Sequence, residues 1–308
     1  MSYPGPSIRV NVDVNNPGQF FACCGLLELA DRLWPGAEGW FDQSSRCFYF
    51  HGTGNDVVEA HVLIKALIDC KVTNTMSASQ VHHRKELGGQ LKGFRREVKA
   101  AVGDRKKKLE RQLKEHDEEK KSLDRLWRER PVVLGEPFNL QIDWFLDDFS
   151  GGIRFKTWAG QQSVIDITRA MSSSIRQGRW GKLDPAIWLR QPSDDESVPF
   201  NFDSNLGPQA SSIDVGYSLD ALKISTQTRP LIEFGAFIGI QRFRPCPVNR
   251  ENRYRYRVWH VPLTAQVASI AASTFLPCPG STDLEFRLLY RTKYLKSFLP
   301  AIQIGISK

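Results

Sequence analysis

The sequence predicts an α+β fold in three parts: a ferredoxin-like portion of split βαβ type over residues 1–83, a basic helical hairpin inserted at 84–130, and a β-rich portion over 131–308. Three observations predict it. Segments of alternating apolar residues and segments of helical spacing follow one another in the order strand, helix, strand, strand, helix. A long charged stretch with helical spacing interrupts that order, and alternating segments return after Pro131. The composition, 41% hydrophobic and 25% charged, is that of an ordinary globular core and surface.

The elements of the first part are short and apolar. Residues 7–15 alternate between polar and apolar side chains, which predicts a strand. After a turn at Pro17, residues 20–34 are apolar on almost every side, so we expect a largely buried helix. Residues 39–52 predict two short strands around a Gln-Ser-Ser turn, and residues 55–70 predict a second helix.

The middle part concentrates positive charge. Residues 84–130 carry 17 basic and 10 acidic side chains, a net charge of +7 in a chain whose total is +8. An apolar stripe steps by three and four from Leu87 to Ala101, and a basic stripe on another face holds Lys92, Arg95, Arg96 and Lys99. We expect a helical hairpin that binds a polyanion. A hairpin that binds protein as a scaffold, or a partly frayed surface helix, is the alternative.

The third part returns to alternating segments. The elements expected there are strands at 138–148, 151–158, 253–263 and 282–295, a helix at 163–175, and a long loop at 189–218. Residues 230–241 are nearly all apolar and begin with Pro230, which suits the first position of a helix. We therefore expect a buried helix over 230–241.

Arginines border this predicted helix and follow it closely. One pair stands at its C-terminal end, where a cation also meets the negative end of the helix dipole. A second group alternates with Tyr254 and Tyr256, so in a strand its members share one face, which suits a phosphate backbone. The residues that we expect to face a nucleic acid are Arg242, Arg244, Arg250, Arg253, Arg255 and Arg257. The alternative is that these arginines cap carbonyl groups and pair with acids such as Glu233.

Residues 151–162 offer a further candidate surface. Gly160 permits a close approach of the backbone, a tryptophan can stack on a base, and glutamines can read base edges. We expect contacts to nucleic acid from Arg154, Lys156, Trp158, Gln161 and Gln162. An exposed edge strand with one tryptophan explains the same residues.

Catalytic patterns are sparse. His82, His83 and Glu86 lack the spacing of a zinc-binding helix, and the Asp143–Asp148 group is followed by no lysine or histidine motif of a nuclease. P-loop, nucleophile-elbow and dinucleotide-binding patterns are absent from the sequence. We expect a protein with no catalytic residue, metal or cofactor. A metal-dependent nuclease or RNA-processing endonuclease that uses these histidines or aspartates is the alternative.

The sequence also predicts a cellular location. No apolar run approaches the roughly 18 residues of a membrane span, and the N-terminal residues lack the features of a signal peptide. The six cysteines form no C-x-x-C pair, which favours reduced thiols over a structural zinc site. We expect a cytoplasmic protein without a membrane partner.

Two segments resemble a known family. "VNNPGQFFACCGLLELADRLW" at 14–34 resembles the N-terminal segment of a protein encoded beside type I-U CRISPR systems, also called I-G. "RPLIEFGAFIGIQRFRP" at 229–245 resembles a segment of the same large-subunit-like proteins of CRISPR-Cas effector (Cascade) complexes. The resemblance implies an antiviral defence role in a crRNA-guided complex, with crRNA, target DNA, the other subunits and a helicase-nuclease as partners. In such complexes base pairing reads the sequence, while protein reads a short flanking motif and backbone shape.

Overall fold

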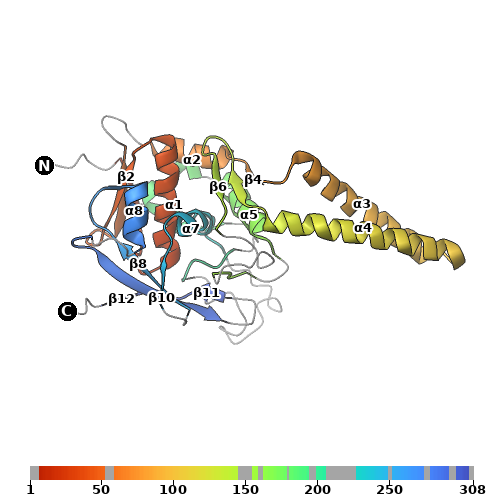
Figure 1. The fold of residues 1–308 in the computed structure, drawn as a ribbon. Coiled ribbons are helices and arrows are strands. Elements are labelled where there is room, and N and C mark those ends of the chain that lie inside the picture. The colour runs from red at the N-terminus through yellow and green to blue at the C-terminus, as the bar shows by residue number, and fades with distance from the viewer. Residues whose placement is uncertain are drawn as a thin grey trace.

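The computed structural model describes residues 7–52, 59–144, 155–158, 162–178, 180–193, 199–205, 227–248, 252–273, 278–290 and 296–304. A mixed body of helices and antiparallel sheets carries a two-helix hairpin that projects far from it (Figure 1). The helices are α1 (Pro17–Leu33), α2 (Ala60–Asp69), α3 (Ala78–Ala100), α4 (Gly103–Glu129), α5 (Val164–Gln177), α7 (Pro230–Arg242), α8 (Ala265–Ala272) and the short 3₁₀ turns η2 (Trp180–Lys182) and η3 (Pro185–Arg190). The strands are β1 (Ile8–Asn11), β2 (Glu38–Asp42), β3 (Cys47–His51), β4 (Val72–Asn74), β5 (Val132–Leu134), β6 (Leu140–Ile142), β7 (Cys246–Val248), β8 (Arg253–Val258), β9 (Leu263–Thr264), β10 (Thr282–Tyr290), β11 (Lys296–Phe298) and β12 (Ile302–Gln303).

The first sheet has the strand order β1-β3-β2-β9, with antiparallel neighbours. In this sheet β3 lies between β1 and β2 and pairs antiparallel with both. The next strand, β4, does not join this sheet beside β1. It pairs with β5 in the sheet β4-β5-β6, and β9 from the C-terminal part adds to β2 instead. The mixed fold with antiparallel sheets is therefore confirmed, while the ferredoxin-like portion is not.

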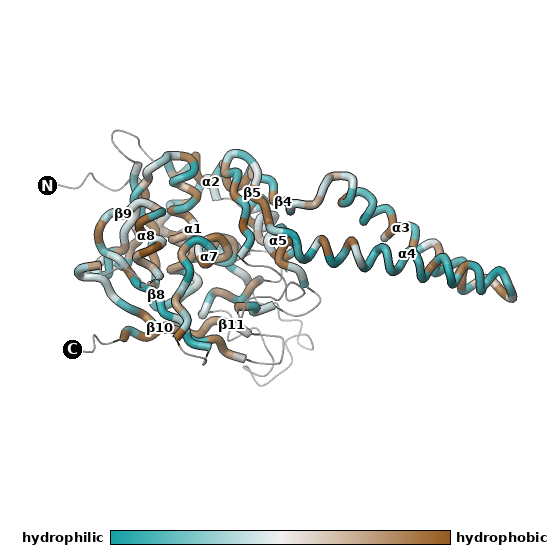
Figure 2. The backbone as a smooth tube through the Cα atoms, in the orientation of Figure 1, coloured by the Kyte–Doolittle hydropathy of each residue, from teal (hydrophilic) through white to brown (hydrophobic). Residues whose placement is uncertain are grey.

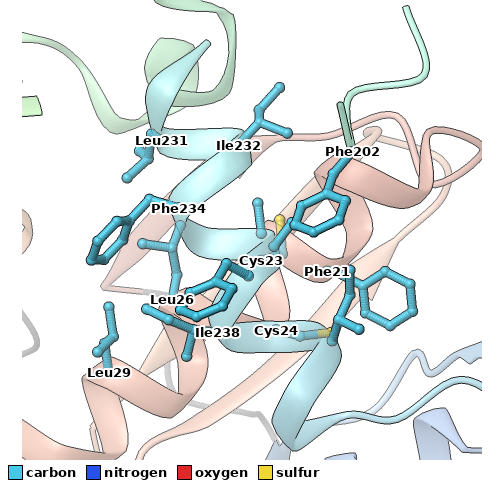
Figure 3. Packing of buried hydrophobic residues seen from close by; sticks show 14 of the residues in the cluster. Phe21, Cys23, Cys24, Leu26, Leu29, Phe202, Leu231, Ile232, Phe234 and Ile238 are labelled. Atoms are coloured by element: carbon cyan, nitrogen blue, oxygen red, sulfur yellow. The ribbon is translucent and has the colours of Figure 1, made fainter. Parts of the chain in front are cut away.

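The centre of the core is the pair of helices α1 and α7, whose side chains interleave in Figure 3. Asn16 caps α1 and Pro17 follows it, while Pro230 occupies the first turn of α7 as its sequence predicts. A Cβ added at Gly25 would meet the carbonyl oxygen of Gly235, so the two backbones touch. Both helices are buried on nearly all sides, which explains why neither shows an amphipathic pattern.

The sheet β11-β10-β8-β7, with β12 on β10, covers one side of this helix pair. The ring of Tyr256 on β8 lies 4.3 Å from that of Phe20 on α1, centroid to centroid, and Tyr254 points to the same buried side. Because side chains alternate along a strand, the arginines of β8 face outward. The expected alternation of arginine and tyrosine is confirmed.

The hairpin consists of α3, about 34 Å long, and α4, about 40 Å long. It begins at Ala78 rather than residue 84, because Ser77 and Gln80 form a reciprocal capping box there. At its root the ring of Trp127 lies between the guanidinium groups of Arg84 and Arg169, at 4.6 and 4.7 Å. The indole N–H of Trp127 donates to Asp166 on α5 over 3.1 Å, which fixes the hairpin to the body. Figure 2 shows a predominantly hydrophilic hairpin and hydrophobic α1 and α7.

Some expected elements differ from the structure. Residues 155–158, the described part of the strand predicted at 151–158, form a turn and irregular backbone. The C-terminal part contains α5, α7 and α8 between its strands, so it is less β-rich than expected. Residues 55–58 of the helix expected at 55–70 lie outside the described residues, and α2 begins after Glu59. Within the part of the chain that the structure describes, no helix has the length and apolarity to cross a membrane.

Candidate nucleic-acid interface

Charge divides the hairpin into two regions, which we call the head (residues 92–114) and the stalk (residues 78–91 and 115–130). The head carries ten basic and three acidic side chains, a net charge of +7. The stalk carries seven of each and is neutral. Because the turn between α3 and α4 is at the far end of the hairpin, the head is the part most distant from the body (Figure 1). The hairpin therefore holds a cationic head on a neutral stalk.

Ion pairs between the helices explain this division. In the stalk, His83 lies 2.8 Å from Glu119 and Arg84 lies 2.6 Å from Asp124, so cations of α3 meet carboxylates of α4. The head has only three acidic side chains that could pair with its ten cations. Eight of its ten cations are exposed and make no ion pair with any described residue: Lys92, Arg96, Lys99, Arg105, Lys106, Lys108, Arg111 and Lys114.

The four hairpin residues expected to bind phosphates all lie on exposed positions of α3 in the head. Lys92, Arg96 and Lys99 follow the spacing i, i+4, i+7, so they share one helical face. Arg95 donates to Asp117 over 3.0 Å, yet its side chain is 60% exposed. Like charges at this spacing repel one another by a few tenths of a kcal/mol per pair, so a bound polyanion would reduce the electrostatic repulsion within the head.

The arginines around α7 make structural contacts. Arg229 pairs with buried Asp203 at 3.0 Å, and Arg242 pairs with buried Glu28 at 3.2 Å. Arg244 donates to the carbonyl of Gln241 at the C-terminal end of α7, and its guanidinium lies 5.0 Å from the ring of Trp144. The alternative of capping and ion pairing is thus observed, with Asp203 and Glu28 as acids in place of Glu233.

The arginine row of β8 is paired with carboxylates of the neighbouring strand β10. Arg253 and Arg255 share Glu285 at 3.1 and 3.0 Å, and Arg257 holds Asp283 at 2.6 Å. The hydrogen bond that Arg257 donates to Asp283 raises the pKa of Arg257 above its ordinary value. The row therefore presents guanidinium edges whose charge is largely neutralised.

One further arginine belongs to this outer face. Arg287 is exposed and lies directly opposite Arg253 in the β8–β10 register. With it, four guanidinium groups stand over two carboxylates, so this face of the sheet keeps a net positive charge. The alternation of Asp283, Glu285 and Arg287 along a predicted strand is the sequence signal that places it there.

The α7 arginines and the β8 row are not brought together. The row faces outward from the sheet, while Trp144 beneath Arg244 packs on Phe155, whose ring lies 4.2 Å from that of inward-facing Tyr254. The sheet thus separates the two groups. A single continuous surface, as their sequence proximity suggests, is not formed because alternate side chains of a strand point to opposite faces.

The candidates in the 151–162 segment lie in the interior. Trp158 is fully buried against Phe200, and Lys156 is 8% exposed with its ammonium 5.7 Å from the indole ring. This corrects the exposed strand face expected there, because a buried ring has no face left for a base. Gln162 is half-buried at the start of α5. Arg154, Gln161 and Arg250 lie outside the described residues.

The residues of the enzyme alternative are dispersed. His82 lies 3.3 Å from Glu86, and His83 pairs with Glu119, so both histidines serve as partners of surface carboxylates in the stalk. Asp143 is described, whereas Asp147 and Asp148 are not. Among the described residues, no group of three or more histidine, cysteine or acidic side chains is placed to hold a metal ion.

The structure shows one polar cluster that the sequence does not suggest. Glu233 is fully buried and accepts the backbone N–H groups of Phe202 and Asp203 at 3.1 Å. Asp203 is also buried and accepts from the side chain of Asn16, the cap of α1, at 2.7 Å. Desolvation raises the pKa of Glu233 to about 8. These bonds join the N-terminal ends of α1 and α7 through residues 202 and 203, which is a structural task.

Comparison of this chain with protein-family models, with curated proteins and with solved structures found no match.

Proposed function

We propose that this protein is a non-catalytic nucleic-acid-binding subunit of a crRNA-guided type I CRISPR surveillance complex. The observation that carries the proposal is the cationic head, with eight exposed and unpaired cations among the described residues at the end of a long, fixed hairpin. Uncompensated cations attract phosphates irrespective of sequence, because binding releases counterions from the nucleic acid. Nucleic acid is thus the partner that suits the head best.

The CRISPR part of the proposal rests on the resemblance of residues 14–34 and 229–245. These segments include α1 and α7, the helices that pack against each other at the centre of the core. We propose that the protein works in the cytoplasm with crRNA, target DNA, the other subunits and a helicase-nuclease. It contributes to recognition of the motif that flanks the target and to assembly of the effector.

Finer features of the fold belong to the same proposal. Residues 1–83 are a ferredoxin-like unit whose fourth strand pairs elsewhere, and the order β1-β3-β2 supports this. The basic hairpin is an insertion between β4 and β5, two strands that pair directly with each other although the whole hairpin lies between them in sequence.

The test is reconstitution of the complex with its co-encoded subunits and guide RNA, followed by binding to a library of flanking sequences. We expect the protein to copurify with the guide RNA and the other subunits. Replacing Arg255 or Arg287 by Ala should weaken binding, because both are the more exposed guanidinium groups of the outer face. Loss of preference at one flanking position would identify a base-reading residue. The expected loss of binding free energy for such a residue is about 1–3 kcal/mol.

Two results would contradict the proposal. Failure to copurify with any co-encoded subunit or guide RNA would remove the CRISPR assignment. Magnesium-dependent cleavage of labelled RNA or DNA by the purified protein, lost on replacing His83 by Ala, would favour the nuclease alternative instead.

A further inference from the structure

A pocket with a volume of about 380 Å³ lies at the root of the hairpin, between β4 and α5. Its lining consists of Lys71, Val72, Thr73, Arg169, Ser172 and Arg176. On α5 the polar members follow the spacing i, i+3, i+7, so Arg169, Ser172 and Arg176 stand on one helical face. Three cations and two hydroxyl groups therefore surround one hollow.

Backbone carbonyls hold both arginines in place. The Nε of Arg169 donates to the carbonyl of Val72 over 3.0 Å, and that of Arg176 donates to the carbonyl of Ile68 over 3.0 Å. Arg169 is further fixed by its stacking on Trp127. Each guanidinium keeps N–H groups that no described residue accepts. Because a guanidinium is a planar fork, these groups suit the oxygens of a tetrahedral anion.

The residues that line the pocket include no carboxylate in the part of the chain that the structure describes. Lys71, Arg169 and Arg176 make no ion pair with a carboxylate in the described part of the chain. Ser172 is only 6% exposed and lines the pocket from α5. Burial lowers the pKa of Arg169, although the nearby Asp166 carboxylate acts in the opposite direction. Cations without a paired carboxylate, together with hydroxyl groups in the same lining, are the features of a site for an anion.

We propose that this pocket binds a phosphate group of a nucleic-acid backbone, as a second contact point besides the head. This inference rests on the proposed nucleic-acid binding and assigns it a further site. From Trp127 at the root to Arg105 in the head, α4 advances about 33 Å, which equals the rise of about ten base pairs of duplex. A nucleic acid longer than this reaches both sites, and a shorter one reaches only one of them.

The test compares the full-length protein with a pocket variant, Lys71→Gln with Arg176→Gln. Its control is Arg46→Gln with Lys182→Gln, which removes the same charge from exposed positions elsewhere on the body. Binding is measured against salt for duplexes of about 6 and about 20 base pairs. We expect the pocket variant to bind the longer duplex about 3- to 10-fold more weakly, with a log–log salt slope smaller by about 1. The shorter duplex should bind it nearly as well as the wild type.

Equal binding of the long duplex by the pocket variant and its control would overturn the inference. A head variant, Lys92, Arg95, Arg96 and Lys99 all to Gln, separates this failure from failure of the proposed function. If the head variant loses affinity and the pocket variant does not, only the inference fails. If neither loses affinity, the proposed function fails as well.

A second measurement distinguishes the source of the phosphate. Inorganic phosphate replaces chloride at equal ionic strength, and the melting temperature is recorded. Stabilisation of the wild type but not the pocket variant supports a phosphate site. If that is found while the long duplex binds both proteins equally, the ligand is a small phosphorylated molecule and the nucleic-acid assignment is overturned. Should the double variant not fold, Lys71→Gln alone serves, because the Lys71 side chain bonds to no described residue.

Discussion

Glu233 shows how a single residue links two helices. Its carboxyl group is buried on α7 and accepts the backbone N–H groups of Phe202 and Asp203. The Asp203 side chain in turn accepts from Asn16, the cap of α1. The cost of burying its charge is the reason for the raised pKa. In the sequence, Glu233 is only an acid inside an apolar run. Its role is not visible there, because the N–H groups that its carboxylate accepts belong to residues about thirty positions away in the chain.

This pKa predicts how stability depends on pH. The folded-state value of about 8 lies above the ordinary value of 4.5, so the folded protein binds this proton more tightly than the unfolded chain. The stability from that proton is complete below pH 4.5 and is lost as the pH rises through 8. Relative to Glu233→Gln, the wild type should therefore lose up to about 1.4 kcal/mol of unfolding free energy per pH unit across this range. Urea denaturation at several pH values measures the unfolding free energy of both proteins. A difference between them that does not change with pH would rule out the titration of Glu233.

At the scale of elements, close contact between α1 and α7 determines the core. A Cβ at Gly239 would clash with the carbonyl oxygen of Phe21, and that backbone cannot move without shifting α1. Gly239→Ala should therefore destabilise the protein by about 1–3 kcal/mol. Gly89→Ala in α3 is the matched control, because nothing lies within 4 Å of its added Cβ. It should stabilise by up to about 1 kcal/mol through helix propensity. Chemical denaturation of both variants checks the prediction. An equal change in the unfolding free energy of the two variants would contradict it.

Long, compositionally distinct elements were predictable from the sequence, and short ones were not. The α7 helix follows from its apolar run after Pro230, and the hairpin follows from its helical stripes. The strands β4 and β5 have three residues each, which is too few for an alternating pattern to be recognised in the sequence. Residues 155–158 show the alternation of a strand in sequence but form a turn and irregular backbone, with Lys156 and Trp158 both buried.

At the scale of the whole molecule, the candidate site was only partly predictable. The charge of the hairpin is local, so the sequence shows it directly. Pairing across the sheet is not local, because the acids that hold the β8 arginines come from β10. The cations of the pocket at the root of the hairpin come from α5 and from Lys71, the residue before β4. The sequence therefore identifies a basic hairpin, but it does not show which arginines are already neutralised.

The most direct test of the cationic head is the salt dependence of duplex binding by a variant with Lys92, Arg95, Arg96 and Lys99 all changed to Gln. Its control removes four exposed cations of the stalk, Lys85, Lys121, Arg125 and Arg130. We expect the head variant to bind every sequence more weakly, with a log–log slope flattened by up to about four units, since each lost phosphate contact removes about 0.9. The stalk control should change little. An unchanged affinity and slope in the head variant, or an equal loss in the stalk control, would contradict the account.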